Sequence, residues 1–145
     1  MARRQSNRHN RAMTRWIAAY IATLATFCVL DFLWLGFLAK GFYQAQVGPL
    51  MLSRPNLVPA AILYALCAAG LLVFAIMPAP SLARAALAGA FLGLVVYGVY
   101  DLTNLAVLKG WTVPVALVDM AWGTVVCAAS SSVGYGAARL ASGGG

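Results

Sequence analysis

Acidic side chains and histidine are almost missing from this sequence. Its 145 residues contain three aspartates, no glutamate and one histidine, His9. With a single histidine, neither a histidine-rich iron site of the membrane-desaturase kind nor a His-based catalytic triad can form. The sequence also has no G-x-S-x-G segment and no phosphate-binding loop, so it lacks these common motifs of hydrolases and nucleotide-binding proteins.

Cysteine is rare as well, and its spacing indicates no particular chemistry. Cys28, Cys67 and Cys127 each fall in a different apolar segment, without a C-x-x-C pair or a metal-binding spacing. We therefore expect no disulfide framework and interpret the three thiols as small buried side chains. The sequence identifies no cofactor and no metal.

Apolar residues, by contrast, dominate the chain. It is 63% hydrophobic and 9% charged, whereas soluble domains have about 25% charged residues, so the composition indicates an integral membrane protein. The formal net charge of +7 does not indicate nucleic-acid binding, because half of the ten cations directly precede the first apolar run and are typical of a topology signal. These five are Arg3, Arg4, Arg8, Arg11 and Arg15.

Four apolar segments are long enough to cross a bilayer as helices. We predict one all-α domain over residues 14–140, preceded by a disordered basic tail at 1–13 and followed by a flexible end at 141–145. The loop at 41–56 holds two prolines with apolar residues between them, which favours an interfacial or partly re-entrant piece. The predicted spans cover about residues 16–39, 57–77, 82–108 and 112–140.

The cations also predict the orientation of the four spans. If the N-terminus is cytoplasmic, the five arginines above lie inside together with Arg84 and Arg139, seven in all. Only Lys40, Arg54 and Lys109 then lie outside. Seven against three satisfies the positive-inside rule, so we expect both termini in the cytoplasm and a bilayer as the main partner.

The two halves of the chain share a pattern that occurs in the same order in each. A Val-Pro pair opens the second and fourth segments, and an aspartate followed by Lys-Gly ends the first and third. We predict from this two helical hairpins in parallel repeat. The matched residues are Val58-Pro59 with Val113-Pro114, and Asp31, Lys40 and Gly41 with Asp101, Lys109 and Gly110.

All three aspartates interrupt apolar segments at one expected depth. Each lies about 12–13 Å along its helix from Lys40, Lys109 or Trp111, which we take to mark the outer interface. An ionised aspartate facing lipid costs about 2.5–3.5 kcal/mol near the bilayer centre, so we expect the carboxyls to turn inward and form one polar cluster in the outer half of the membrane. They are Asp31, Asp101 and Asp119.

Other polar and aromatic side chains share these helix faces. A polar or aromatic residue stands three residues after each aspartate. Further hydroxyl groups belong to Tyr97 and Thr103, about a turn or less from Asp101, and to Tyr64, at the position that the repeat pairs with Asp119. The candidate binding residues are Asp31, Asp101, Asp119, Asn104, Thr103, Tyr97, Tyr64, Trp34 and Trp122.

Several states of this cluster remain open. In the first, the aspartates are protonated. In the second, they hold a hard cation through carboxylate and amide oxygens. In the third, Arg54 from the outer loop is their counter-ion. Alternatively, the same side chains are structural and only form hydrogen bonds between helices, each contributing about 0.6–2 kcal/mol.

Two further patterns are assigned packing roles. Aromatic residues near the expected interfaces are interpreted as an interfacial belt with no other function. Rows of small residues in the third and fourth segments are expected to allow close helix packing within the chain, with a homodimer contact as the alternative. The belt comprises Trp16, Tyr20, Phe42, Tyr43 and Trp111; the rows comprise Ala85, Gly89 and Gly93, then Ser130 with Gly134 and Ser132 with Gly136.

At these residues the sequence resembles a family of small bacterial inner-membrane proteins catalogued only as a domain of unknown function. The resemblance covers about residues 14–137 and implies a four-span protein of the bacterial inner membrane, without an assigned activity. Its most specific parts are residues 30–36 (Leu-Asp-Phe-Leu-Trp-Leu-Gly), 42–43 (Phe-Tyr), 100–106 (Tyr-Asp-Leu-Thr-Asn-Leu-Ala), 108–111 (Leu-Lys-Gly-Trp) and 119–123 (Asp-Met-Ala-Trp-Gly).

Three functions fit these observations. The first is binding or translocation of a cation, a proton or a small amphipathic solute at the aspartates. The second is a membrane enzyme that uses paired carboxyls as general acid and base on a lipid or isoprenoid, although no nucleophile is evident. The third is an accessory subunit that packs against itself or a larger membrane complex through its small residues.

Overall fold

The computed structural model describes residues 2–143, and the side chains from His9 onward. All regular structure among these residues is helical. The elements in chain order are α1 (Ala2–Leu33), the π-helical η1 (Trp34–Leu38), α2 (Lys40–Val47), the 3₁₀ turn η2 (Gly48–Leu50), α3 (Leu57–Gly70), the π-helical η3 (Leu71–Ile76), α4 (Leu82–Val107) and α5 (Val113–Ala141).

The four predicted spans are confirmed. Helices long and apolar enough to cross a membrane run over His9–Leu38, Leu57–Ile76, Leu82–Val107 and Val113–Ala141. Many large apolar side chains on them are exposed, for example Phe74, Phe91 and Leu117. An apolar outer surface of this extent is stable in lipid, which is as apolar as the side chains themselves.

The disorder predicted for the basic segment before the first span stays a prediction; in the structure α1 begins at Ala2. No glycine or proline precedes Gly36, and Ala, Arg, Gln and Met all favour helix, so nothing in the sequence ends the helix before the apolar run. Residue 1 of the predicted tail and residues 144–145 of the predicted flexible end lie outside the described residues.

Polar side chains begin three of the helices. Asn56 Oδ1 accepts a hydrogen bond from the backbone N–H of Val58 at 3.1 Å. Ser81 and Thr112 cap α4 and α5 in the same way. These caps satisfy N–H groups that have no partner inside the helix. Between α4 and α5, Gly110 has φ +90°, a left-handed conformation that glycine adopts without a steric penalty.

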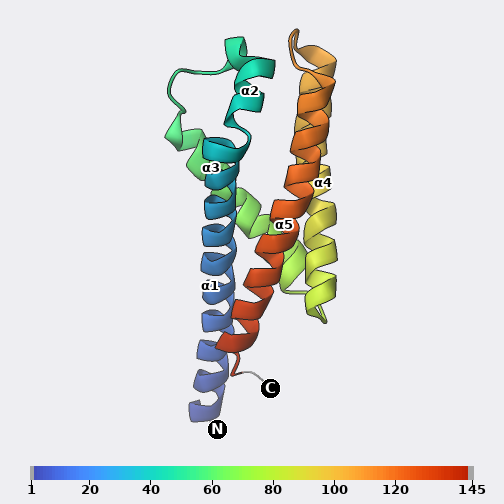
Figure 1. Ribbon diagram of the computed structural model, residues 1–145. Coiled ribbons are helices and arrows are strands. Elements are labelled where there is room, and N and C mark those ends of the chain that lie inside the picture. Colours follow the sequence, from blue (N-terminus) through green and yellow to red (C-terminus); the bar gives the residue numbers. More distant parts are fainter. Residues whose placement is uncertain (1, 144–145) are drawn as a thin grey trace.

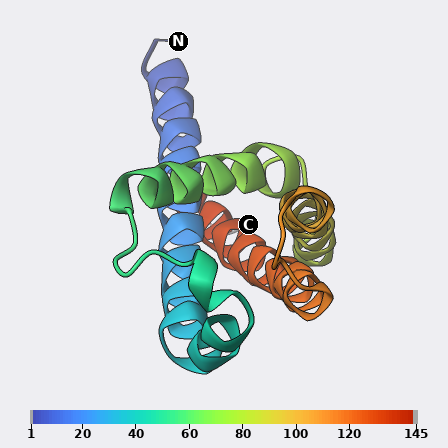
Figure 2. The ribbon, with the colours of Figure 1, turned by 90° about the horizontal axis from the view of Figure 1, so that it is seen from above.

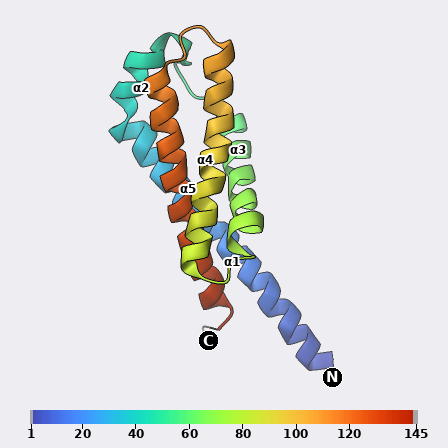
Figure 3. The same cartoon turned by 90° about the vertical axis from the view of Figure 1, so that its right-hand side faces the viewer.

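The helices form a bundle in which α5 packs against both α4 and α1. Both termini lie at one end, here called the termini end; α2 and the α4–α5 turn at Gly110 lie at the other, the loop end (Figure 1). Viewed from above, α1 and α3 cross, and α4 lies to one side of them (Figure 2). The N-terminal part of α1 extends away from the bundle (Figure 3). The parallel two-hairpin repeat stays a prediction.

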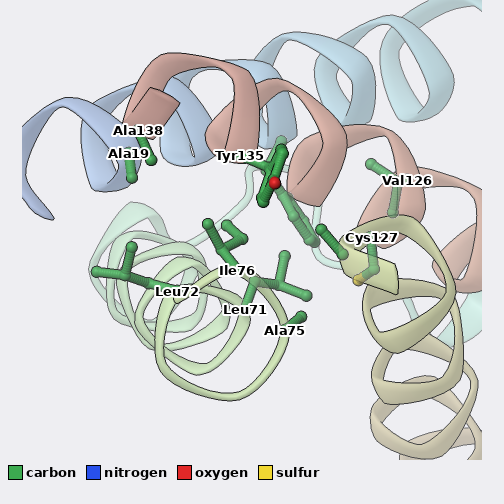
Figure 4. Packing of buried hydrophobic residues seen from close by; sticks show 11 residues of the cluster. Ala19, Leu71, Leu72, Ala75, Ile76, Val126, Cys127, Tyr135 and Ala138 are labelled. Carbon is green, nitrogen blue, oxygen red and sulfur yellow. The ribbon is translucent and has the colours of Figure 1, made fainter. Parts of the chain in front are cut away.

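The apolar core gathers around η3. Leu71 and Ile76 are buried against residues of α5 such as Val126 and Tyr135 (Figure 4). Helix α4 approaches α5 so closely that a Cβ added at Gly93 would lie 2.2 Å from the carbonyl oxygen of Gly123. An added Cβ at Gly136 meets no atom within 4 Å, so the expectation fails for the Ser132–Gly136 row; at Gly93 the expected use of small residues for packing within the chain is confirmed. The same holds for Gly89, against Cys127 and Ser131, and for Gly134, against Thr23 and Ile76.

Candidate functional site

The three aspartates lie near helix ends that meet at the loop end of the molecule. Asp31 precedes the end of α1 at Leu33, Asp101 lies in the last two turns of α4, and Asp119 lies in the first two turns of α5. These are the ends next to α2 and the α4–α5 turn (Figure 1). The fold therefore brings the carboxyls to the same end of the bundle, where each has a different set of partners.

Asp31 is held by donors from two other helices. It is 6% exposed. Its Oδ2 accepts a hydrogen bond from the Tyr64 hydroxyl of α3 at 2.8 Å. Its Oδ1 accepts one from Trp122 Nε1 of α5 at 2.7 Å. Both carboxylate oxygens are thus used, and the side chain ties α1 to α3 and α5 by hydrogen bonds of the strong, charge-assisted kind when Asp31 is ionised.

Asp119 is held by α2. The Tyr43 hydroxyl donates a hydrogen bond to Asp119 Oδ1, and Trp34 Nε1 in turn donates to the Tyr43 oxygen at 3.4 Å. The rings of Trp34 and Trp122 are stacked, with centroids 4.4 Å apart and an interplanar angle of 5°. This stack joins the partners of Asp119 to those of Asp31. The pairing is crossed: Trp34, three residues after Asp31, serves Asp119, and Trp122, three residues after Asp119, serves Asp31.

Asp101 differs from the other two because it is incompletely bonded. It is 0% exposed. Its Oδ1 accepts a hydrogen bond from Trp111 Nε1 at 3.2 Å, whereas its Oδ2 is buried with no hydrogen-bond partner in the described part of the chain. A buried polar atom without a partner costs about 1–3 kcal/mol, so this oxygen calls for an explanation.

Three predicted residues lie outside this network. The Tyr97 ring packs on Gly123, where an added Cβ would lie 2.2 Å from ring atoms. Thr103 lines an apolar groove of about 590 Å³ along α4, together with Gly98 and with Met120 of α5. Asn104 is half-buried. Within residues 9–143, no hydrogen bond joins any of these three to a carboxylate.

Two residues of the site were assigned to the interfacial belt, and that assignment is corrected here. Tyr43 is 7% exposed and binds Asp119, and Trp111 binds Asp101. The sequence did contain a hint, because an aromatic pair or residue follows Lys-Gly in both halves of the chain. Aromatic N–H and O–H groups suit both an interface and a buried acceptor, so residue type alone does not separate the two roles.

The predicted loop at 41–56 supplies Tyr43 because part of it is helical. Helix α2 packs on the start of α5, where Tyr43 and Val47 form a small apolar cluster with Val115. Thr112 Oγ1 also donates to Gln46 Oε1 at 2.9 Å. The π-helical turn η1 separates α1 from α2, and such turns are frequent at functional sites.

No cation neutralises the aspartates within the described residues. Arg54, which we considered as a counter-ion, is exposed in the loop before α3. No group of three His, Cys, Asp or Glu side chains lies close enough to hold a metal ion, again among the residues described. Tyr43 lies outside the spans. Its pKa is raised mainly by burial, and further by its hydrogen bond to Asp119 and by the negative charges of Asp119 and Asp101. Tyr43 therefore remains a neutral donor at physiological pH.

A family described as predicted membrane protein (DUF2177) has a model that matches residues 16–136. The chain belongs to this family. The match includes all nine predicted site residues as well as Tyr43 and Trp111, so the whole network falls inside the DUF2177 region. No curated protein and no solved structure matches the chain. Family membership thus supports an integral membrane protein of unknown function.

Proposed function

We propose that this protein takes up and releases a proton at Asp101, as part of binding or translocating a small solute from the loop end. The observation that carries the proposal is the buried Asp101 Oδ2 without a partner. Protonation removes the negative charge of this buried carboxyl without any rearrangement of the helices. Intramembrane carboxyls serve in proton relays of pumps and transporters.

The surroundings of Asp101 support exchange of that proton. Trp111 is the only hydrogen-bond donor that contacts Asp101 in the described chain, and it is neutral. Tyr43 donates a hydrogen bond to Asp119, and the charges of Asp119 and Asp101 contribute to its raised pKa. Asp119, at the same end of the bundle, is the second carboxyl of the proposed relay. A metal site formed by the three carboxylates has less support, because no three His, Cys, Asp or Glu side chains of the described residues lie close enough together to hold a metal ion.

We further propose that the protein lies in a bacterial inner membrane with both termini in the cytoplasm. The excess of cations at the termini end supports this orientation. Protons or solutes would then reach the aspartates from the outer side, where α2 lies.

The test replaces Asp101 by Asn in purified protein and measures thermal unfolding from pH 5 to 9. The Asn amide oxygen can still accept from Trp111, and its neutral NH₂ group replaces the oxygen that lacks a partner. We expect Asp101→Asn to raise the melting temperature, because ionised Asp101 is a buried charge with a single neutral donor. Raising the pH should lower the melting temperature of the wild type more than that of the variant.

The matched control is Thr103→Val, two residues away on the same helix and lining the apolar groove. It should keep the pH dependence of the wild type. If Asp101→Asn instead lowers stability and leaves the pH dependence unchanged, Asp101 is a structural residue and the proposed function is overturned.

A further inference from the structure

A second polar site lies at the termini end, away from the aspartates. A cavity of about 430 Å³ opens there between the start of the first span, the α3–α4 turn and the end of α5. Its lining is unusually basic for a chain with so few charges. The lining residues are Arg15, Ala79, Pro80, Tyr135, Arg139 and Ser142.

Arg15 is the residue that calls for a ligand. Its Nε is buried and has no hydrogen-bond partner in the described residues. The guanidinium group carries a permanent charge and presents its N–H groups as a planar fork, a geometry that matches phosphate oxygens. The charge of Arg139 faces the same cavity. Two guanidinium groups around one cavity attract an anion and repel a cation.

The neighbouring hydroxyl groups leave anion binding mainly to the arginines. The Tyr135 hydroxyl donates to the carbonyl oxygen of Pro80 at 3.4 Å. Ser142 Oγ donates to the carbonyl oxygen of Ala138 at 2.8 Å. Asp31, the aspartate on α1 itself, lies sixteen residues or about 24 Å farther along the helix and does not compete for Arg15.

The position of the cavity along the spans identifies the kind of anion. Arg15 stands where α1 changes from polar to apolar residues, immediately before Trp16, and Arg139 lies in the last turn of α5. Ala79 and Pro80 lie between the end of η3 and the start of α4. These helix ends are at the level of the lipid headgroups, where basic pockets between spans bind phosphate-containing headgroups. The volume is in the range of small-molecule sites and exceeds what a bare phosphate fills.

We infer that Arg15 and Arg139 form a binding site for a phosphate group, carried by an anionic phospholipid headgroup or by a free phosphate ester. This site does not depend on the proposed role of the aspartates. It would anchor the start of α1 to the end of α5 through a bound lipid, at the end of the bundle where α1 begins to diverge from the other helices (Figure 3).

The test is a thermal-shift titration of the full-length protein in neutral detergent with phosphatidylglycerol, phosphatidylcholine or inorganic phosphate. We expect phosphatidylglycerol to raise the melting temperature of the wild type and phosphatidylcholine to have a much smaller effect. Arg15→Gln should raise the phosphatidylglycerol concentration needed for the half-maximal shift about fivefold. This is the contribution of roughly one basic residue at a membrane surface. The control Arg84→Gln removes an exposed arginine from the same end of the bundle, outside the cavity, and should respond as the wild type does.

The inorganic phosphate arm separates the two sources of the phosphate group. Protection by phosphate alone that is lost in Arg15→Gln supports the same site with a soluble ligand. An equal response of Arg15→Gln and the wild type to phosphatidylglycerol overturns the inference, as does equal stabilisation by phosphatidylcholine. If Arg15→Gln does not fold, Arg15→Lys is used; it keeps the charge but loses the planar fork, and unchanged affinity in that variant also overturns the inference.

Discussion

At the scale of single residues, the aspartates divide into two kinds by their hydrogen bonds. Asp31 has a fixed donor on each oxygen, from Tyr64 and Trp122. Asp101 has one donor and one oxygen without a partner in the described chain. The same side chain in the same apolar surroundings is therefore suited to holding helices together at position 31 and to binding a ligand at position 101.

This difference predicts opposite effects of the same substitution. Whereas Asp101→Asn should stabilise the protein, Asp31→Asn should destabilise it by about 1–3 kcal/mol, because an amide NH₂ group would face one of two fixed donors. The measurement is the free energy of unfolding in a denaturing detergent titration. Removing the Tyr64 hydroxyl with Tyr64→Phe should recover part of the loss in the double variant. Equal effects of Asn at both positions would contradict the distinction.

At the scale of the helices, the α4–α5 pair depends on glycine. At Gly93 the backbone of α4 approaches that of α5 so closely that a Cβ does not fit, and at Gly123 the Tyr97 ring occupies the space that a Cβ would need. Close approach gains van der Waals contact, one of the interactions that drive helix association in lipid. It also aligns the two helices whose ends carry Asp101 and Asp119.

Two glycine substitutions test this contact. Gly93→Ala places a methyl group against the backbone of α5 and should destabilise the protein by about 1–3 kcal/mol. Gly136→Ala is the matched control, since an added Cβ there meets no atom within 4 Å; it should be neutral or stabilise by up to about 1 kcal/mol through helix propensity. Thermal unfolding of both variants checks the prediction. A stable Gly93→Ala protein would show that the helices separate at little cost.

At the scale of the whole molecule, four spans place both termini at one end and α2 at the other (Figure 1). An even number of spans requires the termini to share a side of the membrane. The orientation then decides which compartment the aspartates face and which leaflet supplies a lipid to the Arg15 cavity.

Labelling of single cysteines tests the orientation. In a variant with Cys28, Cys67 and Cys127 replaced by Ala, we introduce either Ser53→Cys in the loop before α3 or Ser142→Cys after α5. With the termini in the cytoplasm, a membrane-impermeant maleimide should label the cysteine at position 53 on intact cells. The cysteine at position 142 should react only after permeabilisation. The reverse pattern would place the aspartates toward the cytoplasm.

The sequence by itself determined the number of spans and the position of each aspartate along its span. These follow from hydropathy and helical rise, which are properties of one segment at a time. Family membership followed equally from sequence, over residues 16–136.

Only the tertiary structure decided which side chains meet. Asp31 binds Tyr64 and Trp122, which are 33 and 91 residues away, and these contacts depend on how each helix is rotated and crossed against its neighbours. The role of Tyr43 required α2 to dock on α5, a contact between the loop segment and a distant span. Rotation and docking are set by the packing of glycines and small residues across helix pairs, and no periodicity within a single segment encodes them.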